Sequence, residues 1–195
     1  MIQKVIWPTA VGLVLLFVSF FTPTYIYPPK NLIEPRGVFV IDHGTHSSLA
    51  IENSRQQLIR YAYGDFRYYA LRDTGLSSGA AALLFPTPAT LGRAEIKGGA
   101  SLENLSEQLV VAVEVIYQLE VEASAADQLI SKLDSIHLIE REKHVDVPAY
   151  GLVFAPHPDD YFWAHNSSTI VADWLRDMRV ELLGWGLIAS WGLAE

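Results

Sequence analysis

The sequence contains no cysteine in its 195 residues. This absence excludes a disulfide framework, a thiolate metal site and a cysteine nucleophile within the chain. Basic residues are also scarce, because 14 Lys and Arg stand against 22 Asp and Glu and the net charge is −8. Nucleic-acid binding needs a basic surface that neutralises phosphates, so we expect no nucleic-acid partner. Half of the residues are hydrophobic, which is enough for one well-packed domain with an appendage.

Charge is missing altogether between Lys4 and Lys30, and residues 5–21 (VIWPTAVGLVLLFVSFF) are almost wholly apolar. A membrane-spanning helix needs about 20 such residues. The alternative is a cleaved signal peptide, which requires a small-x-small motif after a shorter apolar core, and SFFTPTYIYPP has no such motif. We therefore predict an uncleaved transmembrane signal anchor over residues 1–24.

Residues 25–36 contain Pro28, Pro29 and Pro35 and are predicted to be a linker, because proline favours extended chain. Residues 37–195 are predicted to form a single domain. Strands are expected at GVFVID (37–42), SSLAIE (47–52), QQLIRYAYG (56–64) and AYGLVFA (149–155). EQLVVAVEVI (107–116) fits a strand or a helix, and its valines favour a strand. Helices are expected at TGLSSGAAALLF (74–85), ASAADQLISKLDSIHL (123–138) and NSSTIVADWLRDM (166–178), the last capped by Ser167 or Ser168. The predicted fold class is α+β, an antiparallel sheet packed with helices, plus the transmembrane helix.

Four segments occur in an order that is familiar from a bacterial family. They are VFVIDHGTHSSLAI, YAYGDFRYYA, FPTPATL and YFWAHNSSTIVADWLR, and they span most of residues 38–176. The chain resembles the uncharacterised family called domain of unknown function 2459, whose pattern is similar to circularly permuted papain-like proteins of the NlpC/P60 group. The resemblance implies a permuted papain-like fold and a domain held at the membrane outside the cytoplasm, in the periplasm or cell envelope.

The resemblance also implies the site. Ser167 stands at the family's nucleophilic cysteine, His46 stands at its early histidine, and Asp65 in YGD is the candidate that orients the imidazole. A serine hydroxyl cannot be ionised by a helix terminus as a thiol can, and it needs a general base and an oxyanion hole in line. The same serine is also a favourable residue for capping a helix. Two interpretations therefore stay open, a working hydroxyl nucleophile and a capping residue.

A metal site at His43 and His46 would need further ligands, for which Asp42, His157, Asp159, Asp160 and His165 are the candidates. Their spacing matches no zinc or iron motif, so we predict neither a metal nor a cofactor. His43 is expected to bond to backbone in a tight turn around Gly44.

Two functions are compatible with these residues. The first is a non-catalytic relative of papain-like hydrolases, whose groove binds a peptide, glycan or lipid-linked ligand in the cell envelope. The second is a serine-variant amide or ester hydrolase, or an acyl transferase, in which Ser167 and His46 act. Replacement of the cysteine favours the first.

Overall fold

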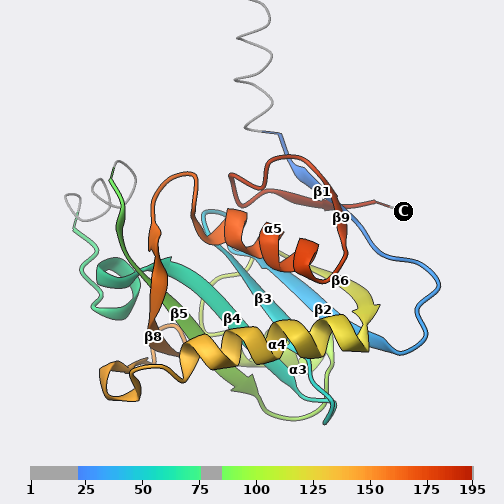
Figure 1. Ribbon diagram of the computed structural model, residues 1–195, viewed down its shortest axis with the longest axis horizontal. Helices are drawn as coiled ribbons and strands as arrows, with labels where there is room; N and C mark the ends of the chain where they lie inside the picture. The colour runs from blue at the N-terminus through green and yellow to red at the C-terminus, as the bar shows by residue number, and fades with distance from the viewer. Residues whose placement is uncertain (1–21, 76–84, 195) are drawn as a thin grey trace, which may run out of the picture.

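The computed structural model of the chain describes residues 22–75 and 85–194. At its centre is an antiparallel sheet with the strand order β6-β2-β3-β4-β5-β8-β7 (Figure 1). The strands are β2 (Pro35–Asp42), β3 (Ser47–Glu52), β4 (Leu58–Asp65), β5 (Thr87–Ile96), β6 (Val115–Glu122), β7 (Val145–Val147) and β8 (Leu152–Tyr161). β2 to β5 follow one another in the chain and in the sheet, so successive antiparallel neighbours build its middle.

One face of the sheet is covered by α4 (Ala123–His137) and α5 (Ser167–Asp177), which cross in front of the strands in Figure 1. Every second residue of a strand points to the same face. Val38 and Val40 of β2 therefore join Leu129 of α4 and Trp174 of α5 in the largest buried apolar cluster.

The intervening residues face the other way. Phe39 and Ile41 of β2 pack with Leu105 of α3 (Leu102–Gln108) in a second cluster. A third cluster joins Ala62 and Phe154 with the π-helix η1 (Phe66–Ala70), and the 3-10 helix η2 (Arg141–Lys143) precedes β7. The sheet is therefore buried on both faces.

A smaller sheet has the order β10-β1-β9, with β1 at Thr24–Tyr27, β9 at Glu181–Leu183 and β10 at Trp191–Leu193. β1 runs antiparallel to β9 and parallel to β10. The chain around β1 was assigned to the end of an anchor and to a linker, but Thr24 and Ile26 are buried and Tyr25 and Tyr27 are exposed. This period of two makes it a half-buried strand.

The predicted fold class requires a correction. Its transmembrane helix has no counterpart in residues 22–75 and 85–194, where no helix is long and apolar enough to cross a membrane. α4, the longest helix there, has 15 residues, and a span needs about 20. The predicted span, residues 1–24, lies outside the described residues except for its last three. The described chain is an α+β fold, mostly antiparallel sheet with few helices.

The predicted strand at residues 107–116 was also wrong. α3 ends at Gln108, β6 begins at Val115, and residues 109–114 form a loop between them. The valines suggested a strand, but Val110 is exposed in the loop and Val113 packs from the loop against the second cluster. The predicted helix at residues 74–85 lies mostly outside the described residues.

Candidate ligand-binding site

A cavity of about 270 Å³ lies on the face of the sheet opposite α4 and α5. The turn between β2 and β3, the strands β4 and β8, η1, the turn before β8 and the loop before β6 contribute to its wall. The lining residues are His43, Thr45, His46, Arg60, Ala62, Tyr63, Tyr68, Tyr69, Val111, Ala112, Tyr150, Leu152 and Phe154. The wall is therefore largely aromatic and apolar with a few polar groups, as is usual for small-molecule sites.

Arg60 is the one charged side chain of this wall, and it is 3% exposed. It lies in the middle of β4, where its Nε donates to Ser48 Oγ at 3.2 Å and its Nη1 donates to the carbonyl of Tyr150 at 3.2 Å. Its Nη2 lies 3.4 Å from His43 Nε2. No salt bridge to Arg60 occurs within residues 22–75 and 85–194. Burial lowers the pKa of Arg60 to about 10, so the side chain is still a cation at neutral pH.

A guanidinium carries five N–H groups. The three contacts of Arg60 use the Nε–H and one N–H on each terminal nitrogen, which leaves one N–H on Nη1 and one on Nη2. A buried, unpaired cation is costly unless an anion or hydrogen-bond acceptors compensate it. Arg60 has acceptors but no acidic partner in the described residues, and its two remaining N–H groups could bind an anion.

His43 holds this arrangement from the turn between β2 and β3. Its Nδ1 donates to the carbonyl of Ala112 at 2.7 Å, which leaves Nε2 as the acceptor that faces Ser48 Oγ at 3.0 Å. The turn needs Gly44, whose φ is +84° and where an added Cβ would lie 2.3 Å from a carboxylate oxygen of Glu114.

His46 enters the cavity beside Tyr69, whose hydroxyl lies 3.0 Å from the imidazole Nδ1. The two rings pack with their centroids 4.9 Å apart. In the described part of the chain His46 Nε2 has no hydrogen-bond partner, so this nitrogen is available to a ligand.

Both imidazoles are neutral at physiological pH. The pKa of His43 is lowered to about 4, first by burial and then by the nearby Arg60, against the opposing effect of the hydrogen bond to the Ala112 carbonyl. The pKa of His46 is lowered to about 3 by burial first, and then by His43 and Arg60. The histidines are hydrogen-bonding groups here, and the charge belongs to Arg60.

Asp65 does not contact His46. Its carboxylate caps η1 by accepting from the Tyr68 N–H at 2.7 Å, and it also accepts from Thr87 Oγ1 at 2.5 Å. Because η1 carries Tyr69, Asp65 positions the phenol that contacts His46. Tyr69, and not Asp65 as predicted, makes the contact that orients the His46 imidazole.

Ser167 and His46 are not brought together either. Ser167 Oγ accepts a hydrogen bond from the Ser47 N–H at 3.2 Å, and Ser47 Oγ contacts Ser168 Oγ and Trp191 Nε1. Successive side chains of an extended chain point to opposite faces, so Ser47 faces α5 and the neighbouring His46 faces the cavity. No hydrogen bond joins Ser167 to His46 in the described chain.

The residue that caps α5 is Asn166, which directly precedes Ser167. Asn166 Oδ1 accepts from the N–H groups of Ser168 and Thr169, and Thr169 Oγ1 accepts from the Asn166 N–H. This reciprocal pair is a capping box. Ser167, expected to cap α5 or to act as a nucleophile, is instead a buried residue that joins the helix to β3.

Ser48 and His43 form the hydroxyl–imidazole pair that the site does contain. Ser48 is fully buried and absent from the cavity wall, and its oxygen accepts from Arg60 Nε. A nucleophile must reach the substrate, so this hydroxyl holds Arg60 and His43 in place.

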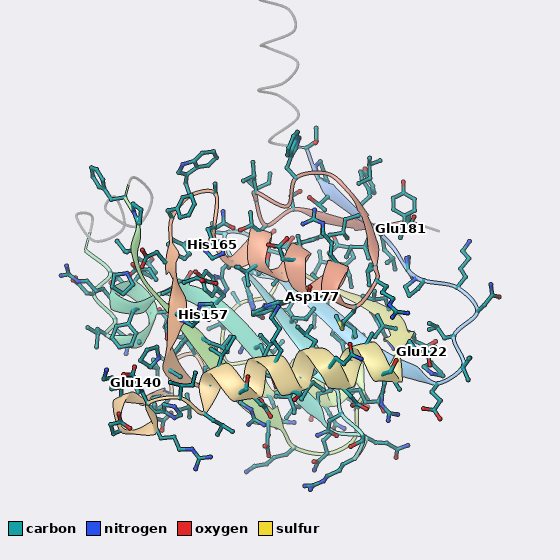
Figure 2. All side chains as sticks on the ribbon, viewed as in Figure 1. Glu122, Glu140, His157, His165, Asp177 and Glu181 are labelled. Atoms are coloured by element: carbon teal, nitrogen blue, oxygen red, sulfur yellow. The ribbon has the colours of Figure 1, made fainter. Side chains whose placement is uncertain are left out.

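The candidate metal ligands do not gather. His157 and His165 lie along β8 and before α5 (Figure 2), and both rings pack against Tyr63. The Tyr63 hydroxyl lies 3.0 Å from His165 Nδ1 and donates to the Asp160 carbonyl. Within residues 22–75 and 85–194 no three histidine or acidic side chains are grouped to hold a metal ion.

Sequence reasoning missed Arg60 and Tyr69. The signal for Arg60 was present, because a lone arginine lies between apolar residues in LIRYAYGD. The segment was predicted only as a strand, and Arg60 was given no role.

Comparison of the chain with protein-family models, curated proteins and solved structures finds no match. The resemblance to domain of unknown function 2459 and to the permuted NlpC/P60 group stays a prediction.

Proposed function

We propose that the protein binds a small ligand that carries a carboxylate on an apolar body, and that it does so without catalysis. The observation that carries the proposal is the buried Arg60, a cation without an acidic partner in the described chain, in the wall of a largely apolar cavity. A carboxylate that bridges Nη1 and Nη2 would take up both remaining N–H groups in a fork, the strongest common mode of carboxylate binding.

A second cavity of about 380 Å³ is a less suitable anion site than the cavity at Arg60. Its lining includes Arg93, but that guanidinium is already paired with the carboxylate of Asp134 at 2.8 Å. An anion there would compete with an existing partner. In the proposed site the anion would meet the cation of Arg60 and no carboxylate among the described lining residues.

The apolar part of the ligand would rest on Leu152, Phe154, Tyr150 and Tyr68. A volume of about 270 Å³ lies just below the usual range of about 300–1,000 Å³ for ligand pockets. This size favours one ring or a short acyl chain over a long peptide or glycan.

Benzoate is a suitable probe, and benzamide is its neutral isostere. We expect benzoate to bind the full-length protein in calorimetric titration at pH 7, and benzamide to bind at least about 10-fold more weakly, because it lacks the charge that pairs with Arg60. Arg60→Met should weaken benzoate binding at least about 10-fold. Arg60→Lys, which keeps the charge and loses the fork, should give a smaller loss.

The matched control is Arg67→Met, since Arg67 lies on the nearby η1 but is exposed and paired with Asp73. It should bind benzoate like the wild type. Thermal unfolding of each variant reports whether it is folded. Equal binding of benzoate and benzamide, no binding of benzoate to the wild type, or full binding by folded Arg60→Met would each refute the proposal.

A further inference from the structure

With the exposed Glu181 of β9 at its border, one surface of the protein has few charged residues. It is built from three segments, residues 22–27 (TPTYIY), 162–166 (FWAHN) and 182–194 (LLGWGLIASWGLA), and we call it the uncharged face. None of the three contains Asp, Glu, Lys or Arg, although these residues make up 18% of the chain. The small sheet of β1, β9 and β10 forms its framework, at the same end of the molecule as the start of the described chain (Figure 1).

The uncharged face exposes large apolar side chains. Leu183 is 63% exposed, Trp163 56%, Trp185 50% and Tyr25 45%. Single exposed apolar side chains are normal on a protein surface. A contiguous group of large ones, however, marks an interaction site.

These side chains belong to one surface. Tyr25, Leu183 and Trp185 line a single hollow of about 480 Å³ together with Thr22 and Pro23.

Trp163 is tied to the same region through Asn166. The amide of Asn166 donates both to the Trp163 carbonyl at 2.7 Å and to the Leu187 carbonyl at 3.0 Å. The loop that carries Trp163 and the loop that follows β9 are thus held side by side.

The sequence that precedes Thr22 indicates what covers the face. Residues 5–21 directly precede Thr22, and they contain no charged residue and are almost wholly apolar. Tryptophan and tyrosine are stable at the depth of lipid headgroups, where the ring is in an apolar layer and the polar tip is hydrated. The absence of charge removes the desolvation cost of bringing the surface to a bilayer.

We propose that the uncharged face rests on the headgroup region of a lipid bilayer, with Trp163, Trp185, Leu183 and Tyr25 as the inserted side chains. The net charge of −8 gives no attraction to anionic lipid, so contact should not require it. This inference is independent of the ligand proposed for the cavity.

The absence of cysteine allows a direct test in the full-length protein. Leu183→Cys and Trp185→Cys each provide a single site for an environment-sensitive fluorophore. The matched control is Ile139→Cys, an equally exposed apolar residue at 57%, beyond the end of α4 and away from β1 and β9. Each labelled protein is mixed with phosphatidylcholine vesicles, with and without a nitroxide-bearing lipid.

We expect labels at 183 and 185 to gain at least about twofold in emission with vesicles, to shift to the blue, and to be quenched by the nitroxide lipid. The label at 139 should change in none of these respects. If the protein binds vesicles but the labels at 183 and 185 stay in water, only residues outside the uncharged face contact lipid, and the proposal is wrong. Blue-shifted emission at 183 without vesicles would show that the chain itself or a second copy covers the face. Failure of the protein to bind vesicles would also overturn it.

Discussion

The neutral state of His43 and His46 follows from their surroundings. Each imidazole would have to lose hydration to be charged inside the wall, and each would meet the guanidinium of Arg60 at close range. Both effects favour the neutral ring, which can accept a hydrogen bond from Arg60 where an imidazolium could not.

The pKa of His43 predicts how stability depends on pH. A histidine whose pKa is about 4 when folded and about 6.5 when unfolded takes up a proton on unfolding between these values. The free energy of unfolding should therefore decrease as the pH falls from about 6.5 toward 4. His43→Gln should remove about 2 kcal/mol of the difference between pH 7 and pH 5, because this residue no longer titrates.

Urea unfolding of the wild type and of His43→Gln at both pH values measures this difference. Titrations that the two proteins share, such as that of Asp42, cancel in the comparison. NMR titration of the folded wild type gives a second readout, in which the His43 ring signals should not move between pH 7 and pH 5. A midpoint near 6.5 would contradict the assignment.

At the scale of elements, the beginning of β3 decides which residues meet. His46 and Ser47 are neighbours in sequence, but the extended chain sends the first to the cavity and the second to α5. Ser167 contacts β3 through Ser47, and no hydrogen bond joins it to His46, the residue named in the predicted pairing. A shift of one residue along an extended chain exchanges the two faces.

Two helix caps offer a matched comparison. Asp65 caps η1, which carries Tyr69 of the cavity, and Asn166 caps α5 on the other face of the sheet. Asp65→Ala should weaken benzoate binding about threefold or more, because η1 loses the bonds to Tyr68 N–H and Thr87 Oγ1 that fix Tyr69.

Asn166→Ala should reduce the free energy of unfolding by about 0.5–2 kcal/mol and leave benzoate affinity unchanged. Calorimetric titration and urea unfolding of both variants give the two quantities. Loss of affinity in Asn166→Ala alone would show that Asp65 does not position the cavity wall.

At the scale of the molecule, Trp191 connects the small sheet to the main one. Its indole Nε1 donates to Ser47 Oγ at 2.9 Å, and its carbonyl accepts from the Tyr117 hydroxyl at 2.6 Å. Trp191 and Ile26 also belong to the largest apolar cluster. The two sheets therefore share one core and should unfold together.

Trp191→Ala should cost about 3–5 kcal/mol, because it empties a buried site and leaves Ser47 Oγ without its indole donor. Trp185→Ala is the control, since that indole is half exposed, and its effect should stay within about 0.5 kcal/mol. Thermal unfolding followed by circular dichroism measures both. Separate transitions for the two sheets would contradict a shared core.

The sequence itself determined the strands at residues 37–42, 47–52 and most of 56–64, and also the two amphipathic helices. The first two strands are apolar runs of strand length, whereas the third strand and the helices show the period of the element they form. The absence of cysteine likewise excluded thiol chemistry within the chain without coordinates, whereas the expectation of no nucleic-acid partner stays a prediction. Which residues meet across the sheet was decided only by the tertiary structure. Arg60, His43 and Ser48 belong to different parts of the chain. Tyr69 contacts His46 from η1, a helix too short for its sequence to show a helical period. Strand register and the direction of each side chain depend on contacts between distant segments, and a local pattern does not contain them.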